Sequence, residues 1–492
     1  ADTYAGFAGW RSMHGLFLER AICLVRRGGR VGLLLPIQVC DLRGYGPLRL
    51  AVTARATVDQ PPGLIGEQSF AGVTGPAGLY SFTVGPTGRA AGSNGSAARW
   101  AWAPLGRRVE VISAAGVLGR IRQKLAAWPQ VPPSAFGDPG VHTGNSAAVL
   151  IASTPGPQRA AIRQGSDVGR YHVARPSRWL RLHLRPCDGR YWRIGPLETY
   201  RRARLLLRQT ADRPIAAWHE PPGYFRNSVL AFFGLAELDE AYVLAVLNSQ
   251  LIGWMHRCSF RDACQRAFPQ VKVEHLRALR LPQEPMGRTS ARQRAWIERL
   301  WRQCQRACLT SGATDDCDGL VELARAPTVV IQHLLARLGR AMTRLAAAWH
   351  AERGRFLARL AEEVRDGPRL QPTSRRSLDR PCREHGERTD SLAALPGCNR
   401  LLGSTACWLA EQPPLEAILR ALARNGCGVR PARLEQQYGQ WLEAQRPIRR
   451  RLIRTDRLID QMVYRLFGLE RGEIAAVQDV LRQYAAAQGD CS

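Results

Sequence analysis

The first 60 residues alternate between two patterns of apolar positions. Residues 14–25 carry apolar side chains three and four positions apart, and Gly28 and Gly29 follow, which predicts an amphipathic helix that ends before the glycines. Residues 31–35 form a short continuous apolar run closed by Pro36, as in a strand buried on both faces of a parallel sheet. A helix over residues 42–54 and a strand over 56–58 complete the alternating order of helices and strands that is typical of a doubly wound α/β sheet.

The pattern changes twice further along the chain. Residues 66–96 are rich in Gly, Pro, Ser and Thr around a strand-like stretch at 78–84, so a first domain is expected to span residues 1–110. Short apolar segments separated by Pro and Gly then predict a mixed α+β domain over 111–289. From 290 to 492 the apolar spacing is helical, with a helical hairpin or coiled coil expected over 329–364 and a polar, disordered insert near 366–395.

The charge balance points to a polyanionic partner. The chain has 70 Lys+Arg against 41 Asp+Glu, a formal net charge of +29 and a pI near 10.8. Such a chain neutralises phosphates and releases counterions, which makes nucleic acid the first partner to consider. Lys124 and Lys272 are its only lysines, so a bias toward arginine codons is the alternative explanation.

The cysteine and hydropathy patterns predict a cytoplasmic protein with reduced thiols. Thirteen cysteines are scattered without a regular framework, and there is no signal peptide and no apolar run of 18 residues, so no membrane is expected as a partner. Cys304, Cys308 and Cys317 lie close together, but the paired CxxC spacing of a zinc site is missing. We therefore expect no metal site.

Several motifs, in a fixed order, resemble one family. Residues 14–36, with their helix, Gly-Gly turn and strand, resemble the segment that follows the catalytic motif in TaqI-like amino-group DNA methyltransferases. Residues 205–218 and 243–251, with the turn Leu247-Asn248-Ser249, resemble the target-recognition domain of that family, which closes at a Leu-Pro pair, here Leu281-Pro282. Residues 138–145 and 459–469 resemble the entry loop and the C-terminal helix of its long members, which combine modification with restriction.

The resemblance implies the fold, the activity and the partner. It implies an α/β chain with the end of a Rossmann-like methyltransferase sheet, then a mixed α+β target-recognition domain and a helical C-terminal region. The implied activity is site-specific adenine-N6 DNA methylation in a restriction-modification or phage-defence system, with S-adenosylmethionine as cofactor and double-stranded DNA as partner. Such enzymes take the target base out of the duplex, and Phe70 best matches the aromatic residue that stacks on it.

Two of the family's motifs are missing from these 492 residues. Neither the Asn-Pro-Pro-Tyr loop, which receives the target amino group, nor the Gly-rich cofactor loop is present, and both would precede residue 1. We therefore expect the C-terminal portion of such an enzyme, with no catalytic residue of its own and no methyl transfer by this chain alone. Its partner would be a missing N-terminal catalytic half or a separate subunit. A metal-dependent nuclease is also not expected, because Arg122 and Gln270 stand where an acidic residue would precede each lysine.

The residues expected to contact DNA come from the entry loop, the recognition strands and the final turn of the recognition domain. They would fix the register on phosphates and reach base edges. They are Thr143, Asn145, Arg208, Arg213, Asn248, Arg257, Arg261 and Lys272. Two alternatives stay open: a non-catalytic DNA-binding specificity subunit that pairs with a separate catalytic chain, and a basic α/β scaffold unrelated to DNA.

Overall fold

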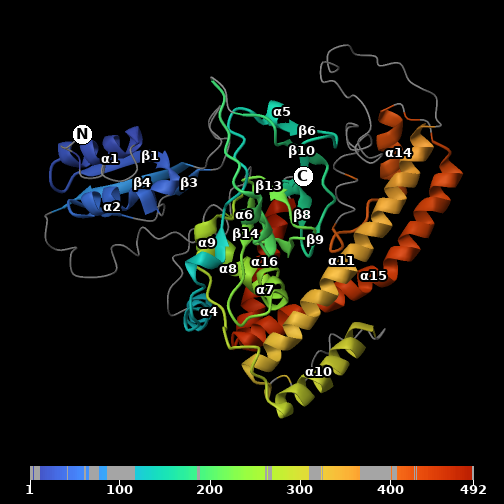
Figure 1. The fold of residues 1–492 in the computed structure, drawn as a ribbon. Coiled ribbons are helices and arrows are strands. Elements are labelled where there is room, and N and C mark those ends of the chain that lie inside the picture. The colour runs from blue at the N-terminus through green and yellow to red at the C-terminus, as the bar shows by residue number, and fades with distance from the viewer. Residues whose placement is uncertain are drawn as a thin grey trace.

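The structure is a computed structural model in which the N-terminal part, the mixed α/β part and the helical part can each be followed (Figure 1). It describes residues 4, 12–40, 43–59, 63–65, 77–85, 117–185, 189–260, 263, 269–309, 323, 325–365, 401, 407–425, 427 and 429–489.

The N-terminal unit is a sheet with two helices on one of its faces. Its elements are α1 (Met13–Leu24), β1 (Arg30–Pro36), α2 (Gly46–Thr53), β2 (Ala56–Val58), β3 (Gly63–Ile65) and β4 (Ala77–Val84), with short 3-10 turns at Ile37–Cys40 and Arg43–Tyr45. The strand order is β1-β4-β2, and β4 also pairs with β3. Because β4 is antiparallel to both β1 and β2, those two strands are parallel to each other with β4 between them.

This arrangement differs from the expected strand buried on both faces. Leu18 and Ile22 of α1 pack on Val31 and Leu35, which makes one face of β1 a core. On the other face, Leu34 is 43% exposed and lies opposite Leu79 of β4. The continuous apolar run therefore belongs to a strand with an antiparallel neighbour and, within the described residues, one covered face.

The middle of the chain stacks two four-stranded sheets. One has the order β12 (Ala216–Trp218), β11 (Leu205–Arg208), β14 (Val229–Phe232), β5 (Phe136–Gly137), with every pair antiparallel. The other has the order β13 (Tyr224–Phe225), β7 (Arg159–Arg163), β10 (Arg178–Arg181), β6 (Ile151–Ala152), in which β13 and β7 are parallel. Alternation along β11 sends Leu206 toward the second sheet, and Leu205 and Leu207 toward the helices on the opposite side.

Short elements complete this part. They are α4 (Val117–Ala126), the 3-10 turns Pro133–Ala135 and Gly165–Asp167, α5 (Ala147–Leu150), the hairpin β8 (Val168–Gly169) and β9 (His172–Val173), α6 (Leu197–Arg201), α7 (Glu240–Leu247), α8 (Gln250–Ser259) and α9 (Val273–Arg277). Helix α7 is apolar on all sides and buried from Ala241 to Leu247, because the first sheet lies on one side of it and α11 on another.

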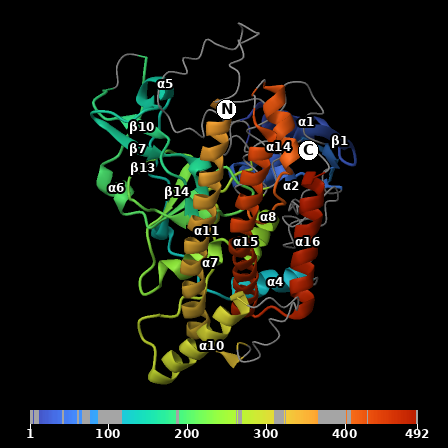
Figure 2. The same cartoon turned by 90° about the vertical axis from the view of Figure 1, so that its right-hand side faces the viewer.

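The C-terminal part is helical, with α10 (Ala291–Leu309), α11 (Thr328–Arg365), α14 (Leu415–Arg424), α15 (Pro431–Leu466) and α16 (Arg471–Gly489). Helices α11 and α15 lie side by side and antiparallel along most of their length (Figures 1 and 2). Of the two expectations for 329–364, a helical hairpin or a coiled coil, the hairpin is not formed: the segment is one 38-residue helix that packs along α15. The apolar stripe of α11 indicated that the helix packs against another helix. It did not indicate which helix, and the partner α15 begins about 100 residues after the start of α11.

The helical pair contributes to two cores. Near α7, Leu334 and Trp349 of α11 share a core with Ile459 and Val463 of α15 and with Trp254 of α8. Farther along the pair, Phe356, Trp441 and Ile418 form a separate core with α14. The helical region is therefore built into the same body as the two sheets at one end and extends away from it at the other (Figure 1).

Candidate nucleic-acid interface

Five loops of the mixed α/β part are held next to one another by hydrogen bonds, most of them between backbone groups. Ser228 is at the centre: its Oγ accepts from the Gly165 amide at 3.0 Å and its carbonyl accepts from the Gln209 amide at 3.1 Å. The Gln209 carbonyl in turn accepts from the Val271 amide at 2.8 Å, and the Asn227 amide donates to the Val141 carbonyl at 3.2 Å. We call residues 141–145, 164–167, 209–212, 226–228 and 270–272 the loop cluster.

Arg226 of the loop cluster and Arg178, which acts on it electrostatically, have no ion-pair partner among the described residues. Arg226 follows β13 and is half-buried, and its Nη2 donates to Thr143 Oγ1 at 3.1 Å while its Nε has no partner. Burial lowers the pKa of Arg226, and the charge of Arg178, which begins β10, lowers it further. Among the described residues no carboxylate lies within 4 Å of either guanidinium. The pair is suited to bind an anion such as a phosphate.

Asp167, an acidic group on which Arg178 acts electrostatically, is already engaged in a hydrogen bond. Its Oδ2 accepts from the Gln164 amide at 2.7 Å, which closes the 164–167 turn. Burial raises the pKa of Asp167, against the opposing effects of that hydrogen bond and of the charges of Arg178 and Arg163. The other carboxylate of the cluster, Asp212, forms an ion pair with Arg257, so neither acidic residue of the cluster is paired with Arg226 or Arg178.

Arg208 and Lys272, both predicted to contact DNA, lie at this cluster. Arg208 ends β11 immediately before the 209–212 loop, is half-buried, and has an Nε without a partner. Lys272 is half-buried in the 270–272 loop, where its amide donates to His275 Nδ1 at 3.2 Å at the start of α9. The fold therefore brings two predicted residues together with Arg178 and Arg226, which the sequence reasoning missed. The sequence did contain a signal for the two missed arginines, because each lies at the end of a short strand: Arg178 is the first residue of β10, and Arg226 directly follows β13.

Thr143 and Asn145 shape the entry loop. Thr143 is 5% exposed and its hydroxyl holds Arg226. The exposed Asn145 donates from Nδ2 to the Gly189 carbonyl at 2.7 Å, and its Oδ1 accepts from the Tyr191 amide at 3.2 Å. Gly144 between them has φ +50°, and a Cβ there would lie 2.3 Å from the Tyr191 carbonyl oxygen. Asn145 thus binds residues 189–191 to the entry loop, and Thr143 holds the guanidinium of Arg226.

Asn248, one of the predicted DNA contacts, is buried and makes structural hydrogen bonds. It is 2% exposed at the end of α7. Its Oδ1 accepts from the Ala216 amide at 3.1 Å, and its Nδ2 donates to the carbonyls of Ala216 and Leu244 at 2.9 and 3.1 Å. The side chain therefore pairs with strand β12 as a backbone segment would, which explains why the turn is a landmark of the domain. Ser249 then caps α8, with its Oγ accepting from the Ile252 amide.

Arg257 and Arg213 are also placed away from the surface that was expected for them. Arg257 is 7% exposed and forms an ion pair with Asp212, with its Nε 3.0 Å from Oδ2, and its guanidinium lies 4.4 Å from the centroid of the Tyr484 ring. Burial lowers the pKa of Arg213 to about 10, and the neighbouring charges of Arg170 and Arg257 act in the same direction. Arg257, on α8, thus joins Asp212 to Tyr484 of α16, and Arg213 packs against Gly253 of α8. Arg261 and Phe70 lie outside the described residues.

Next to these arginines, a buried polar junction fixes α15 to the mixed α/β part. Arg170 donates from Nη1 and Nη2 to the two carboxylate oxygens of Asp456 at 3.0 and 2.6 Å, and from Nη2 to the Asn248 carbonyl at 2.8 Å. One turn further along α15, Asp460 Oδ1 accepts from the Gln250 amide at 2.7 Å. Because the β8–β9 hairpin that carries Arg170 directly follows the 164–167 turn, α15 also braces the loop cluster.

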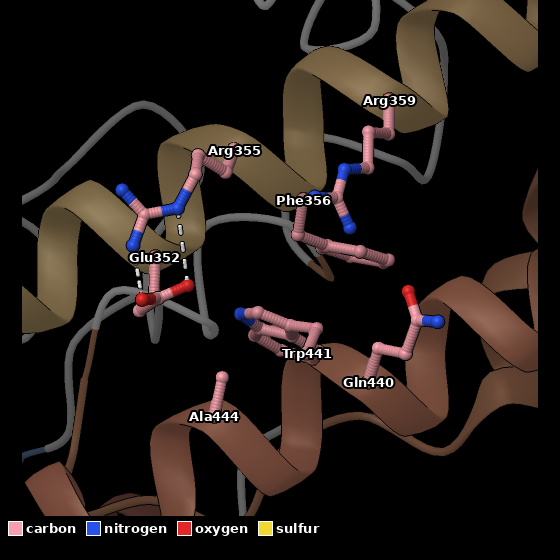
Figure 3. A pocket seen from close by; sticks show the side chains of 7 residues that line it. All are labelled: Glu352, Arg355, Phe356, Arg359, Gln440, Trp441 and Ala444. Carbon is pink, nitrogen blue, oxygen red and sulfur yellow. Dashed lines mark hydrogen bonds and ion pairs between the residues drawn. The ribbon is translucent and has the colours of Figure 1, made fainter.

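A small cavity lies elsewhere, between α11 and α15 (Figure 3). It has a volume of about 220 Å³, and Phe356 and Trp441 stack beneath it with ring centroids 4.4 Å apart. It is lined by Glu352, Arg355, Phe356, Arg359, Gln440, Trp441 and Ala444. Among the described residues, no group of three or more His, Cys, Asp or Glu could hold a metal ion, and no helix is long and apolar enough to cross a membrane.

One protein-family model matches part of this chain. Residues 160–281 match the TaqI-like C-terminal specificity domain, a range that begins in β7, ends at Leu281 and contains every part of the loop cluster except residues 141–145. The match covers less than half of the chain. No curated protein matches.

One solved structure, the type IIG restriction endonuclease BpuSI, is similar over 65% of this chain and 48% of its own, with 10% identity and a TM-score of 0.24. The chain thus spans about half the length of that structure. At this TM-score no residue role is transferred from it.

Proposed function

We propose that this chain is the DNA-reading portion of a site-specific adenine-N6 DNA methyltransferase of a restriction-modification or phage-defence system, and that it acts in the cytoplasm. One observation carries the proposal. The stretch that matches a TaqI-like specificity domain is also the stretch whose loops gather arginines without carboxylate partners. The motif order from residue 14 to 282 supports the methyltransferase part of the proposal.

The loop cluster would act mainly on the DNA backbone. Arg178 and Arg226 form one cationic pair, and Arg208 and Lys272 add charge at the adjoining loops. Contacts of this kind to phosphates fix the register of a protein on the duplex and carry no sequence information themselves. Sequence would be read by groups of the same loops that reach base edges in the major groove.

The methyl donor in the intact enzyme would be S-adenosylmethionine. The described residues do not fit it: the N-terminal sheet has its helices on one face and an exposed Leu34–Leu79 pair on the other, and the 220 Å³ cavity lies far along the chain between two arginine-bearing helices. We therefore derive no catalytic step from this chain. Phe70 stays a prediction for the residue that stacks on the extruded adenine.

The test is DNA binding by the 492-residue chain, measured by fluorescence anisotropy on a labelled random-sequence duplex across a salt series. We expect binding that weakens steeply with salt, and a lower salt slope in Arg178→Gln/Arg226→Gln, by up to about 1.8 for two phosphate contacts. The matched control is Arg204→Gln/Arg340→Gln, because both arginines are exposed and already pair with carboxylates, those of Glu240 and Asp239. If the chain does not bind DNA at low salt, the proposal is wrong and the remaining interpretation is a basic α/β scaffold unrelated to DNA.

A second assay separates the methyltransferase from a non-catalytic specificity subunit. We expect no methyl transfer from S-adenosylmethionine by this chain alone, and adenine methylation when a catalytic half of the same type is supplied. Turnover by the purified chain would overturn the first expectation. If methylation were restored only by an independent catalytic subunit, the specificity-subunit alternative would be correct.

A further inference from the structure

One segment of α15 concentrates arginine. Residues 446–457 contain six arginines and a single acidic residue, Asp456. Asp456 is buried and paired with Arg170, so it does not offset the charge of its own helix. Arg449 is also engaged, since its Nε and Nη2 donate to the carbonyls of Trp408 and Ala410 at 2.8 and 3.1 Å.

Three of the remaining arginines form a line on the outside of the helix. Arg446, Arg450 and Arg454 are spaced four residues apart, and helical geometry places them on one face. The opposite face, which includes Leu452, Thr455 and Ile459, is buried. Arg446 and Arg450 are exposed and Arg454 is half-buried. We call these three residues the arginine stripe.

The stripe differs from other arginines of the helical region in having no carboxylate beside it. Arg355 pairs with Glu352, Arg420 with Glu416 and Arg482 with Asp479. For the stripe, no ion pair or hydrogen bond joins any of the three guanidinium groups to another described residue. Like charges four residues apart destabilise a helix, so the repeat is unfavourable for the isolated chain and is relieved by a polyanion.

The stripe is held in a fixed position relative to the specificity domain. Asp456 and Asp460, within the next two turns of α15, bind Arg170 and the Gln250 amide. Both partners belong to the segment that matches the specificity domain. Buried contacts therefore join the helix that carries the stripe to the segment that matches the specificity domain.

We propose that the arginine stripe binds the phosphate backbone of the duplex next to the segment read by the specificity domain. The inference rests on the proposed function, since it requires that the chain bind DNA. Steps of four residues are about 6 Å along a helix, so the stripe is about 12 Å long. Duplex DNA carries one negative charge per about 1.7 Å, so three guanidinium groups meet enough phosphates over that length. The contact adds sequence-independent affinity and lengthens the footprint.

The experiment compares two triple variants of the full chain on the same labelled random-sequence duplex. One is Arg446→Gln/Arg450→Gln/Arg454→Gln, and the control is Arg355→Gln/Arg420→Gln/Arg482→Gln, which removes the same net charge from arginines that have carboxylate partners. Gln is close to Arg in helix propensity, so both variants are expected to keep their helices, which circular dichroism and melting temperature check. The salt slope of the binding constant is the readout.

We expect the stripe variant to lose up to about 2.7 of the salt slope, and the control to keep the slope of the unmodified chain. Equal slopes in the stripe variant and the unmodified chain would overturn the inference while leaving DNA binding itself intact. An equal loss in both variants would also overturn it, because net charge alone would then explain the effect. If the unmodified chain fails to bind, the proposed function fails first.

Discussion

The buried pair between Arg170 and Asp456 gives the sharpest test of how the helical region is joined to the specificity domain. The two side chains are 10% and 7% exposed and meet through two hydrogen bonds. Burial alone would lower the pKa of Arg170, but the charge of Asp456 raises it above its usual value. Asp456→Asn keeps the shape of the side chain and removes the charge, which leaves a buried guanidinium without its main counterion.

The expected cost follows from what remains around Arg170. Breaking one side of a buried pair costs about 3–5 kcal/mol. The lower end applies here, because Asp460 also acts on Arg170 and because Arg170 keeps its bond to the Asn248 carbonyl. A loss of about 3 kcal/mol is a large share of a typical unfolding free energy of about 5–15 kcal/mol. For a urea m-value of about 3 kcal/mol/M, the midpoint falls by about 1 M.

Urea unfolding followed by tryptophan fluorescence measures this loss, because Trp254 and Trp349 are fully buried in the core that the two regions share. The control is Asp479→Asn, whose pair with Arg482 is exposed and contributes at most about 1 kcal/mol. The double variant Arg170→Met/Asp456→Leu is expected to recover part of the loss, since it leaves no unpaired charge. An Asp456→Asn midpoint equal to that of the control would refute this account of the junction.

Three further predictions concern single features of the fold. Asn248→Ala removes three hydrogen bonds and takes the side-chain partner from the buried Ala216 amide, whereas the Ala216 carbonyl keeps its bond from the Tyr171 amide, so we expect a loss of about 2–4 kcal/mol in urea unfolding, with the DNA salt slope of the folded fraction unchanged. Gly144→Ala should lower the melting temperature more than Gly189→Ala: both have positive φ, but only the first places a Cβ against a carbonyl oxygen, and equal effects would contradict the docking of the entry loop. His172 and His350 stack 3.9 Å apart, and burial first, then neighbouring positive charge, lowers their pKa values to about 4 and about 3. Their folded pKa values lie below the unfolded value of about 6.5, so their contribution to stability is present above that pH and is lost as pH falls, and unfolding of His172→Phe/His350→Phe should depend less on pH between 6.5 and 4 than that of the unmodified chain.

The sequence by itself determined the local elements and the kind of domain. The spacing of apolar residues predicted a strand at 56–58, which is β2, and a strand at 78–84, which is all but the first residue of β4. The order of motifs from 205 to 282 predicted a TaqI-like recognition domain, and residues 160–281 match that domain. These features are local in the chain, so periodicity and short motifs are sufficient to specify them.

Only the tertiary structure decided which polar residues are free to act. Asn248 and Arg257 lie on motifs as prominent as that of Arg208, yet the fold uses both to join elements that are distant in sequence: Asn248 to Ala216 of β12, and Arg257 to Asp212 and Tyr484. Arg226 is half-buried beside Thr143, which lies 83 residues earlier in the chain. Hydrogen-bond partners and burial are set by such distant contacts, which the pattern of a single segment does not encode.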